Sequence, residues 1–280
     1  MILSNHLILN RFFSQSTLVE LIDKGSNSVF NTCIDQYLGR DSGACNKLTI
    51  ENMYEFLRKH YRNEYFYKNT LFNKLLIGRH SLNTTTAITE LPIHKSKADF
   101  ILINGKAVVY EIKTDLDSFD RLEHQINDYY KAFPLVYLVT SEANELKAKE
   151  ILSGSNTGLI ILTKRNTLSE RKPAVTDFSL FDKKVMFNIL RKEEFEEIIK
   201  KVYGFLPDVT PVFYYRECFA LLEQIEMKKL YELIIMALKK RNQVEVKEYL
   251  NYVPYELRFL VYFSKSIQRK YKELNEFLNK

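Results

Sequence analysis

Apolar residues recur at helical spacing in both outer parts of the chain. Before residue 61 this pattern predicts helices over about 17–23, 28–38 and 49–62. It returns from about residue 186 onward, for example at Phe195, Ile198, Ile199 and Val202. We therefore expect helical N-terminal and C-terminal regions.

Between these regions the apolar runs become short. A helix over about 66–77, ended by Gly78, precedes three runs of strand length between residues 86 and 113. Helices are then expected over about 117–133 and 142–152, in alternation with buried strands at 135–140 and 158–162. This order of elements predicts an α/β fold with a mixed sheet core.

The domain organisation follows from these patterns. Residues 1–60 form the helical N-terminal region and residues 61–165 the α/β core. Residues 166–185 are mostly polar, so we expect a linker or a long loop there. Residues 186–280 form the helical C-terminal region.

The composition excludes some classes of protein and permits others. With 46% hydrophobic residues in 280, the chain can bury a core, which argues against disorder. The net charge of +6 permits nucleic-acid binding without requiring it. No apolar stretch has the length to span a bilayer, so we expect no membrane partner. Three scattered cysteines, Cys33, Cys45 and Cys218, fit a reducing cytoplasm better than a disulfide framework or a zinc ribbon.

Asn104-Gly105 lies between two strand-like runs and predicts a hairpin. A strict two-residue turn would pair Asp99 with Tyr110 and direct Glu111 to the opposite face of the sheet. A loop of odd length, or a bulge that glycine permits, places Asp99 and Glu111 on the same face. We predict the odd register.

Glu111 and Lys113 are two residues apart on one strand, so both face the same side of the sheet. Burying these charges is costly unless they have partners or a ligand. Asp99 and Glu111, with a carbonyl and waters, could hold Mg²⁺ or Mn²⁺, which prefer oxygen ligands, and the ion could activate a water. Lys113 could orient that water. The alternative is a structural ion-pair network.

Three further residues follow at i, i+4 and i+8 in the next predicted helix, namely Arg121, Gln125 and Tyr129. They would share one helix face, and the alternative is a solvated polar stripe.

His94 could be an auxiliary ligand or base, although an ordinary surface or packed histidine is favoured. Residues 239–241 and 269–270 are basic clusters, which we interpret as solvated helix faces. The aromatic residues within 61–67 could stack on bases, but packing of a helix against the sheet is favoured.

The charged and polar residues between Glu90 and Tyr129, taken in their order along the chain, resemble the motif of the PD-(D/E)XK nuclease superfamily. The downstream part of this series is similar to the RecB-like branch. Ala98 stands where the superfamily motif has proline. The residues that carry the resemblance are Glu90, Asp99, Glu111-x-Lys113 and Gln125-x-x-x-Tyr129.

Residues 61 to about 140 are also similar to the bacterial sce7726 family of that superfamily. The matching pieces are Tyr61-Arg62-Asn63-Glu64, Lys68-Asn69, Ser96-Lys97-Ala98-Asp99, Glu111-Ile112-Lys113, Asp117, Arg121-Leu122, Gln125 and Tyr129.

The resemblance implies a restriction-endonuclease-like fold and a metal-dependent nuclease, with DNA as the favoured substrate. Asp99, Glu111 and the carbonyl of Ile112 would hold Mg²⁺ or Mn²⁺, with Glu90 at the edge of the metal site. Lys113 would position or activate the attacking water. Supporting roles at the site or the nucleic-acid backbone are implied for Gln125, Tyr129, Arg121 and Lys97.

Some RecB-like relatives hold an iron–sulfur cluster with four cysteines, and this chain has three, so we predict no cluster. The alternative function is a non-catalytic module that binds nucleic acid or protein on a nuclease-like fold. The helical C-terminal region is the candidate site for a protein partner.

Overall fold

The computed structural model describes residues 7–39 and 45–280. The chain divides into two compact units. The helical unit comprises Met1–Asn83, Thr114–Leu116 and Gln243–Lys280, and the sheet unit comprises Thr84–Lys113 and Asp117–Asn242.

These units cut across the predicted regions. The first part of the predicted core, residues 61–83, belongs to the helical unit, and the predicted C-terminal region is divided between both units. Contacts between residues far apart in sequence decide the division, and apolar periodicity does not report such contacts.

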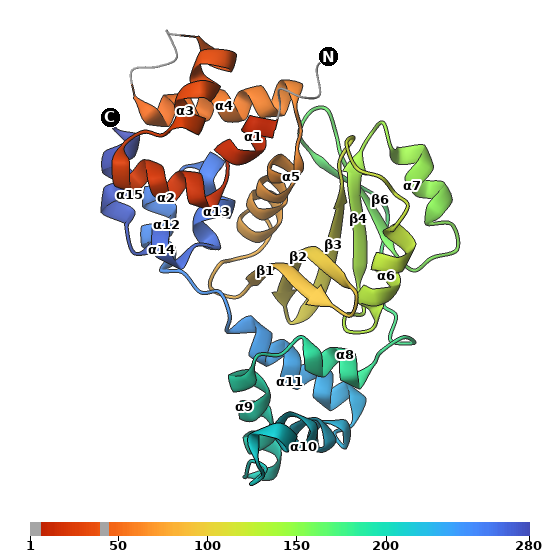
Figure 1. Ribbon diagram of the computed structural model, residues 1–280. Helices are drawn as coiled ribbons and strands as arrows, with labels where there is room; N and C mark the ends of the chain where they lie inside the picture. The colour runs from red at the N-terminus through yellow and green to blue at the C-terminus, as the bar shows by residue number, and fades with distance from the viewer. Residues whose placement is uncertain (1–6, 40–44) are drawn as a thin grey trace. The chain divides into compact units, whose positions relative to one another are not determined.

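The sheet unit contains a six-stranded mixed sheet whose strands follow one another in chain order (Figure 1). β1, β2 and β3 are antiparallel, β3, β4 and β5 are parallel, and β6 is antiparallel to β5. The predicted α/β class with a mixed sheet is confirmed. The strands are β1 (Thr86–Ile93), β2 (Ser96–Asn104), β3 (Lys106–Lys113), β4 (Val136–Ser141), β5 (Gly158–Leu162) and β6 (Leu168–Lys172).

β6 lies inside the segment 166–185, for which the sequence predicted a linker or a long loop. That prediction is wrong for Leu168–Lys172, which pairs with β5. The strand is at the edge of the sheet, and its residues are half-buried or exposed. Charged residues are common on edge strands because they discourage pairing with other chains, so this strand lacks the apolar run that marks a buried one.

Six helices belong to the described part of the sheet unit. They are α6 (Leu122–Tyr130), α7 (Glu145–Ile151), α8 (Lys183–Asn188), α9 (Lys192–Tyr203), α10 (Pro211–Glu223) and α11 (Met227–Lys239). α6 contacts β2 and β4, and α7 contacts β4 and β5. Figure 1 shows α8 to α11 grouped together beyond one end of the sheet.

α6 begins later than the predicted residue 117. The Ser118 hydroxyl accepts a hydrogen bond from the Asp120 N–H at 3.1 Å. Such local turns compete with helix formation, so the helix starts only at Leu122.

One continuous hydrophobic core joins the sheet to its helices. From the sheet it includes Ile101, Val109 and Leu138, and from α6 it includes Leu122 and Ile126. The same core extends into α8 through α11. α6 is therefore held against the sheet by apolar packing, and the polar residues at its inner edge are positioned by that packing.

Within the basic cluster at 239–241, Lys240 is exposed, as we predicted, but Arg241 is not. Arg241 is buried and makes a bidentate pair with Glu194, with both N–O distances at 2.6 Å. Lys240 pairs with Glu197. Both partners are more than 40 residues away in the sequence, so the local pattern did not reveal them.

The helical unit joins the start of the chain to its end. Its elements are α1 (Leu7–Phe12), α2 (Gln15–Lys24), α3 (Ser28–Cys33), η1 (Ile34–Leu38), α4 (Asn46–His60), α5 (Glu64–Leu71), η2 (Phe72–Ile77), α12 (Val246–Tyr252), η3 (Tyr255–Leu257), α13 (Arg258–Tyr262), α14 (Lys265–Gln268) and α15 (Tyr271–Leu278). None of the helices in the described ranges is long and apolar enough to cross a membrane.

Asn69, fully buried on α5, connects the two ends of the chain. Its amide donates to the Tyr255 carbonyl at 3.1 Å, and its side-chain oxygen accepts from the Phe259 N–H at 3.0 Å. Tyr65, in the aromatic segment, donates to the Glu256 carbonyl and stacks on Phe13. Within this unit, these aromatics are therefore packing residues.

Candidate metal and phosphodiester site

The hairpin between β2 and β3 has the predicted odd register. Asn104 pairs with Lys106, and Gly105 alone forms the turn with φ +70°. A positive φ is readily adopted by glycine, which explains its place at the tip of this turn. The printed pairing ends at Phe100 and Tyr110, one residue before Asp99 and Glu111. That both carboxylates share one face of the sheet stays a prediction.

The alternation of β1 and β2 shifts by one residue at Glu90 and Asp99. Ile88 and Leu91 both enter the hydrophobic core, although strict alternation would direct them to opposite faces. Glu90 has φ 56°, which is uncommon for a residue other than glycine and accounts for the shift. The two strands thus present Glu90 and Asp99 at a local irregularity of the sheet.

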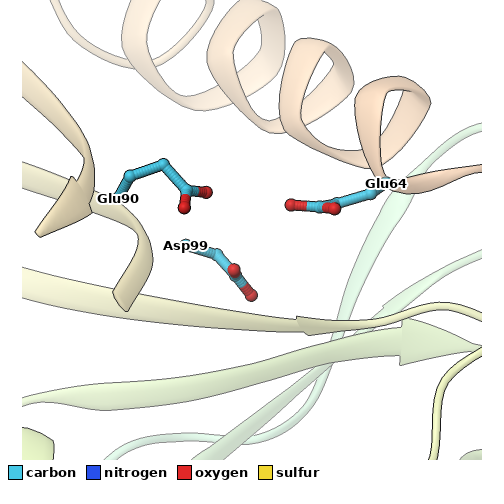
Figure 2. A group of neighbouring side chains, drawn as sticks. All are labelled: Glu64, Glu90 and Asp99. Carbon is cyan, nitrogen blue, oxygen red and sulfur yellow. The ribbon is translucent and has the colours of Figure 1, made fainter. Parts of the chain in front are cut away.

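Figure 2 shows the Glu90 and Asp99 side chains on these neighbouring strands. One carboxylate oxygen of each lies within 4.8 Å of the other. Glu64, also labelled there, belongs to α5 of the helical unit. Two like charges at this separation repel each other, so the arrangement favours a cation nearby.

Each of these two carboxylates also has a partner from the protein. Asp99 Oδ2 accepts a hydrogen bond from the Ile112 N–H at 2.8 Å. This bond brings the carboxylate next to the peptide of Ile112. Glu90 forms an exposed ion pair with Lys97 at 3.1 Å.

Glu111 is the most enclosed charge of the site, with 2% of its side chain exposed. The Tyr129 hydroxyl lies 2.6 Å from Glu111 Oε2 and donates to it. Lys113 Nζ lies 3.2 Å from Glu111 Oε1 and donates to Gln125 Oε1 at 2.9 Å. The structure therefore brings Gln125 and Tyr129 of α6 together with the two charged residues of β3, as the sequence predicted.

Burial raises the pKa of the Glu111 carboxyl above its usual value. The hydrogen bond from Tyr129 and the charge of Lys113 act in the opposite direction but do not reverse the shift. Burial also raises the pKa of Tyr129, and the Glu111 charge raises it further. Ionised Glu111 is thus incompletely compensated, and an additional cation would stabilise it.

The donor set fits a hard divalent cation. Asp99, Glu111, Glu90 and the Ile112 carbonyl offer only oxygen atoms, which suit Mg²⁺ and Mn²⁺ better than zinc. The carboxylates are contributed by three adjacent strands.

Arg121 and His94 line a pocket next to Gln125. Arg121 precedes the first residue of α6, and its exposed side chain lines this pocket of about 670 Å³ with His94. His94 Nε2 lies 4.0 Å from Asp128 Oδ1, so its ionisable neighbour is this aspartate. Arg121 is the N-cap residue of α6, its carbonyl accepts a hydrogen bond from the Gln125 N–H at 3.0 Å, and both residues line this pocket.

Sequence reasoning missed Asp128. It is 7% exposed and accepts hydrogen bonds from the Ser96 hydroxyl at 2.8 Å and the Lys95 N–H at 3.3 Å. Lys131 pairs with it at 2.8 Å. Its position three residues after Gln125, on the inner side of α6, was the available signal.

Comparison with known proteins identifies relatives. A family model described as Bacteriophage P4 protein cII matches residues 57–258. Protein cII of Enterobacteria phage P4 is 24% identical over 177 residues, which cover 61% of this chain. The matched region spans 64% of that relative, which is less than two thirds of its length. No solved structure matches.

Proposed function

This chain belongs to the bacteriophage P4 protein cII family. From the charged residues of its sheet, we propose that it is a metal-dependent nuclease. It would hydrolyse phosphodiester bonds, with DNA as the favoured substrate. The observation that carries the proposal is the buried Glu111, which has Lys113 as its ion-pair partner. Asp99 lies on the neighbouring strand, and its carboxylate accepts a hydrogen bond from the N–H of the next residue, Ile112. Structural ion pairs do not require a second carboxylate at this position, whereas a metal site does.

We further assign the mixed sheet and its flanking helices to the restriction-endonuclease-like class. The support is the position of the motif residues within the sheet. Asp99 lies on β2 and Glu111 and Lys113 on β3, and α6 follows with Gln125 and Tyr129. This order agrees with the PD-(D/E)XK resemblance of the sequence, including its sce7726-like part.

In the proposed mechanism, Asp99, Glu111 and the Ile112 carbonyl would hold Mg²⁺ or Mn²⁺, with Glu90 at the edge. A bound ion of this kind supplies a water of lowered pKa and positive charge for the phosphate. Lys113 donates hydrogen bonds from its ammonium group, which suits it to orient that water and to stabilise developing negative charge.

Two residues of α6 position these groups. Gln125 accepts a hydrogen bond from Lys113 and thereby fixes the direction of its ammonium. Tyr129 donates to Glu111 Oε2 and fixes the carboxylate rotamer. Because α6 is packed into the core, both constraints depend on a rigid element.

The test is cleavage of single- and double-stranded DNA and RNA with Mg²⁺ or Mn²⁺. We expect the wild type to cut at least one substrate. The Asp99→Asn variant should lose that activity, and Asp120→Asn, an exposed aspartate in the turn before α6, should keep it. If wild type binds nucleic acid but does not cut in either metal, the proposal is contradicted and a non-catalytic binding module becomes the better account.

A further inference from the structure

A pocket of about 670 Å³ lies within the sheet unit, between the turn that joins β1 to β2 and helix α6. Its volume is in the range of pockets that enclose a small ligand, about 300–1,000 Å³. The residues that line it are His94, Lys95, Ser96, Lys97, Arg121, His124, Gln125, Asn127, Asp128 and Lys131.

The lining is strongly basic. Four lysine and arginine side chains and two histidines face a single carboxylate, Asp128. That carboxylate is already satisfied by Lys131, the Ser96 hydroxyl and the Lys95 N–H. Burial raises the pKa of Asp128, but these hydrogen bonds and charges outweigh burial, and its pKa is below the usual value. Asp128 therefore holds the turn against α6 and pairs with Lys131, while Lys97 pairs with Glu90 outside the pocket lining.

Three of the basic side chains have no polar partner within residues 7–39 and 45–280. These are Lys95, Arg121 and His124, none of which makes an ion pair or a side-chain hydrogen bond there. Lys95 and Arg121 come from different segments, the turn before β2 and the residue before α6. The positive charges of Lys95 and Arg121 repel each other in this pocket, because neither has a counter-ion. The arrangement therefore favours an anionic ligand.

The pocket adjoins the proposed catalytic residues. Gln125 lines it and also accepts the hydrogen bond from Lys113. Lys97 lines it as well, and its carbonyl lies 2.9 Å from the Tyr129 hydroxyl that contacts Glu111. An anion in the pocket would thus be separated from the proposed site by single side chains.

We propose that this pocket binds the phosphorylated end of a nucleic-acid strand. The inference rests on the proposed function in that it takes nucleic acid as the substrate, and it adds selection of a strand end. A terminal phosphate carries a charge of about −1.5 to −2 and exposes three oxygens, whereas an internal phosphodiester carries one charge. The excess of basic groups suits the terminal group better. The Arg121 guanidinium would bind two phosphate oxygens, and Lys95 would contribute a point charge.

The test measures binding without catalysis. Fluorescence anisotropy in EDTA would compare one single-stranded DNA sequence with a 5′-phosphate, a 3′-phosphate or hydroxyls at both ends. We expect one phosphorylated form to bind about tenfold more tightly than the hydroxyl form, as for one strong charge-assisted contact. The two phosphorylated forms distinguish which end is recognised.

The matched variants are two double substitutions that each remove two positive charges. Lys95→Ala with Arg121→Gln should abolish the preference for the phosphorylated end. Lys106→Ala with Arg165→Gln, which changes exposed residues outside the pocket, should retain it. The proposal would be overturned if the wild type bound all three forms of the DNA with equal affinity. It would also be overturned if the pocket variant kept the preference for a phosphorylated form.

These outcomes are separable from those of the nuclease proposal. Metal-dependent cutting without any end preference supports the nuclease and contradicts the pocket assignment. End-selective binding that the pocket variant loses, in a protein that never cuts, supports the pocket and contradicts the nuclease.

Discussion

The sheet unit contains two enclosed carboxylates with opposite properties, Glu194 and Glu111. Glu194 receives two hydrogen bonds from Arg241 and one from the Arg191 N–H at 2.7 Å. Burial raises its pKa, but these hydrogen bonds and the Arg241 charge together outweigh burial and leave the pKa below the usual value. Glu111 has a single lysine at 3.2 Å, and burial keeps its pKa above the usual value.

Under the proposed function, this difference distinguishes a structural ion pair, Glu194 with Arg241, from a catalytic one, Glu111 with Lys113. Arg241 is a planar fork that matches the Glu194 carboxylate and also donates to the Ile189 carbonyl at 2.6 Å. Lys113 divides its hydrogen bonds between Glu111 and Gln125. A carboxylate that is buried but incompletely compensated is typical of functional sites, because a ligand can complete the compensation.

The largest expected effect is on catalysis. Glu111→Gln should lower metal-dependent cleavage at least about 10³-fold, equivalent to about 4 kcal/mol, because it removes a metal-binding charge. Glu194→Gln should keep the wild-type rate per folded molecule. Single-turnover cleavage, with the folded fraction measured by circular dichroism, tests this. If Glu194→Gln lost as much cleavage activity as Glu111→Gln, the proposed difference between the two carboxylates would be contradicted.

The next effect is on stability. Arg241→Met should lower the free energy of unfolding by about 3 kcal/mol, because Glu194 is left buried without its counter-ion. Adding Glu194→Leu should recover most of that loss, since an apolar pair replaces the ion pair. Urea denaturation of both proteins measures the change. A double variant as unstable as the single one would contradict this account.

Metal binding should give a comparable stabilisation in the wild type. Mn²⁺ at 100 times its Kd should raise the free energy of unfolding by about 2.7 kcal/mol if it binds the folded state alone. A thermal-shift titration should show the increase in the wild type and in Glu194→Gln. The increase should be absent in Asp99→Asn, and its persistence there would exclude Asp99 as a ligand.

A smaller effect is expected from Tyr129. Tyr129→Phe removes the hydroxyl that orients Glu111, and cleavage should fall about tenfold, as for one hydrogen bond to a charged group. Tyr214→Phe is the matched control, because the Tyr214 hydroxyl donates to Glu196 at the same 2.6 Å. Cleavage rates of the two variants should differ, and identical rates would argue against a positioning role for Tyr129.

The smallest effect is the pH dependence of stability in metal-free protein. The pKa of Glu111 is raised by folding, so its favourable contribution exists at low pH and is lost as pH rises through the folded pKa. Relative to the wild type, Glu111→Gln should therefore gain stability as the pH rises above 4.5, the usual pKa of the carboxyl. For Glu194 the pKa is lowered, so its contribution is present above pH 4.5 and is lost at lower pH. Denaturation at several pH values tests both directions.

The sequence predicted what depends on neighbouring residues. Strand periodicity placed Glu111 and Lys113 on one face, and Gly105 made the odd register reasonable. Helical spacing placed Gln125 and Tyr129 on one face of the predicted helix, and the family resemblance gave that face a role at the site. These placements need only local geometry, and the contacts of Lys113 with Gln125 and of Glu111 with Tyr129 agree with them.

What the sequence did not predict depends on distant partners. Arg241 and Glu194 are 47 residues apart, and nothing in the local pattern indicates that they meet. β6 has polar residues because it is an edge strand, so it resembled a loop. The basic pocket combines a strand turn with a helix, and its charges meet only after folding.

The most direct test of the central claim is the behaviour of Lys113→Met with saturating Mn²⁺. The account predicts that Mn²⁺ still stabilises this variant, because the carboxylates remain. Its single-turnover cleavage rate should nevertheless fall at least about 10²-fold, as expected for loss of a group that assists proton transfer or charge stabilisation. A variant that folds, binds Mn²⁺ and cuts at the wild-type rate would show that the Glu111–Lys113 pair is structural, like the pair of Glu194 and Arg241.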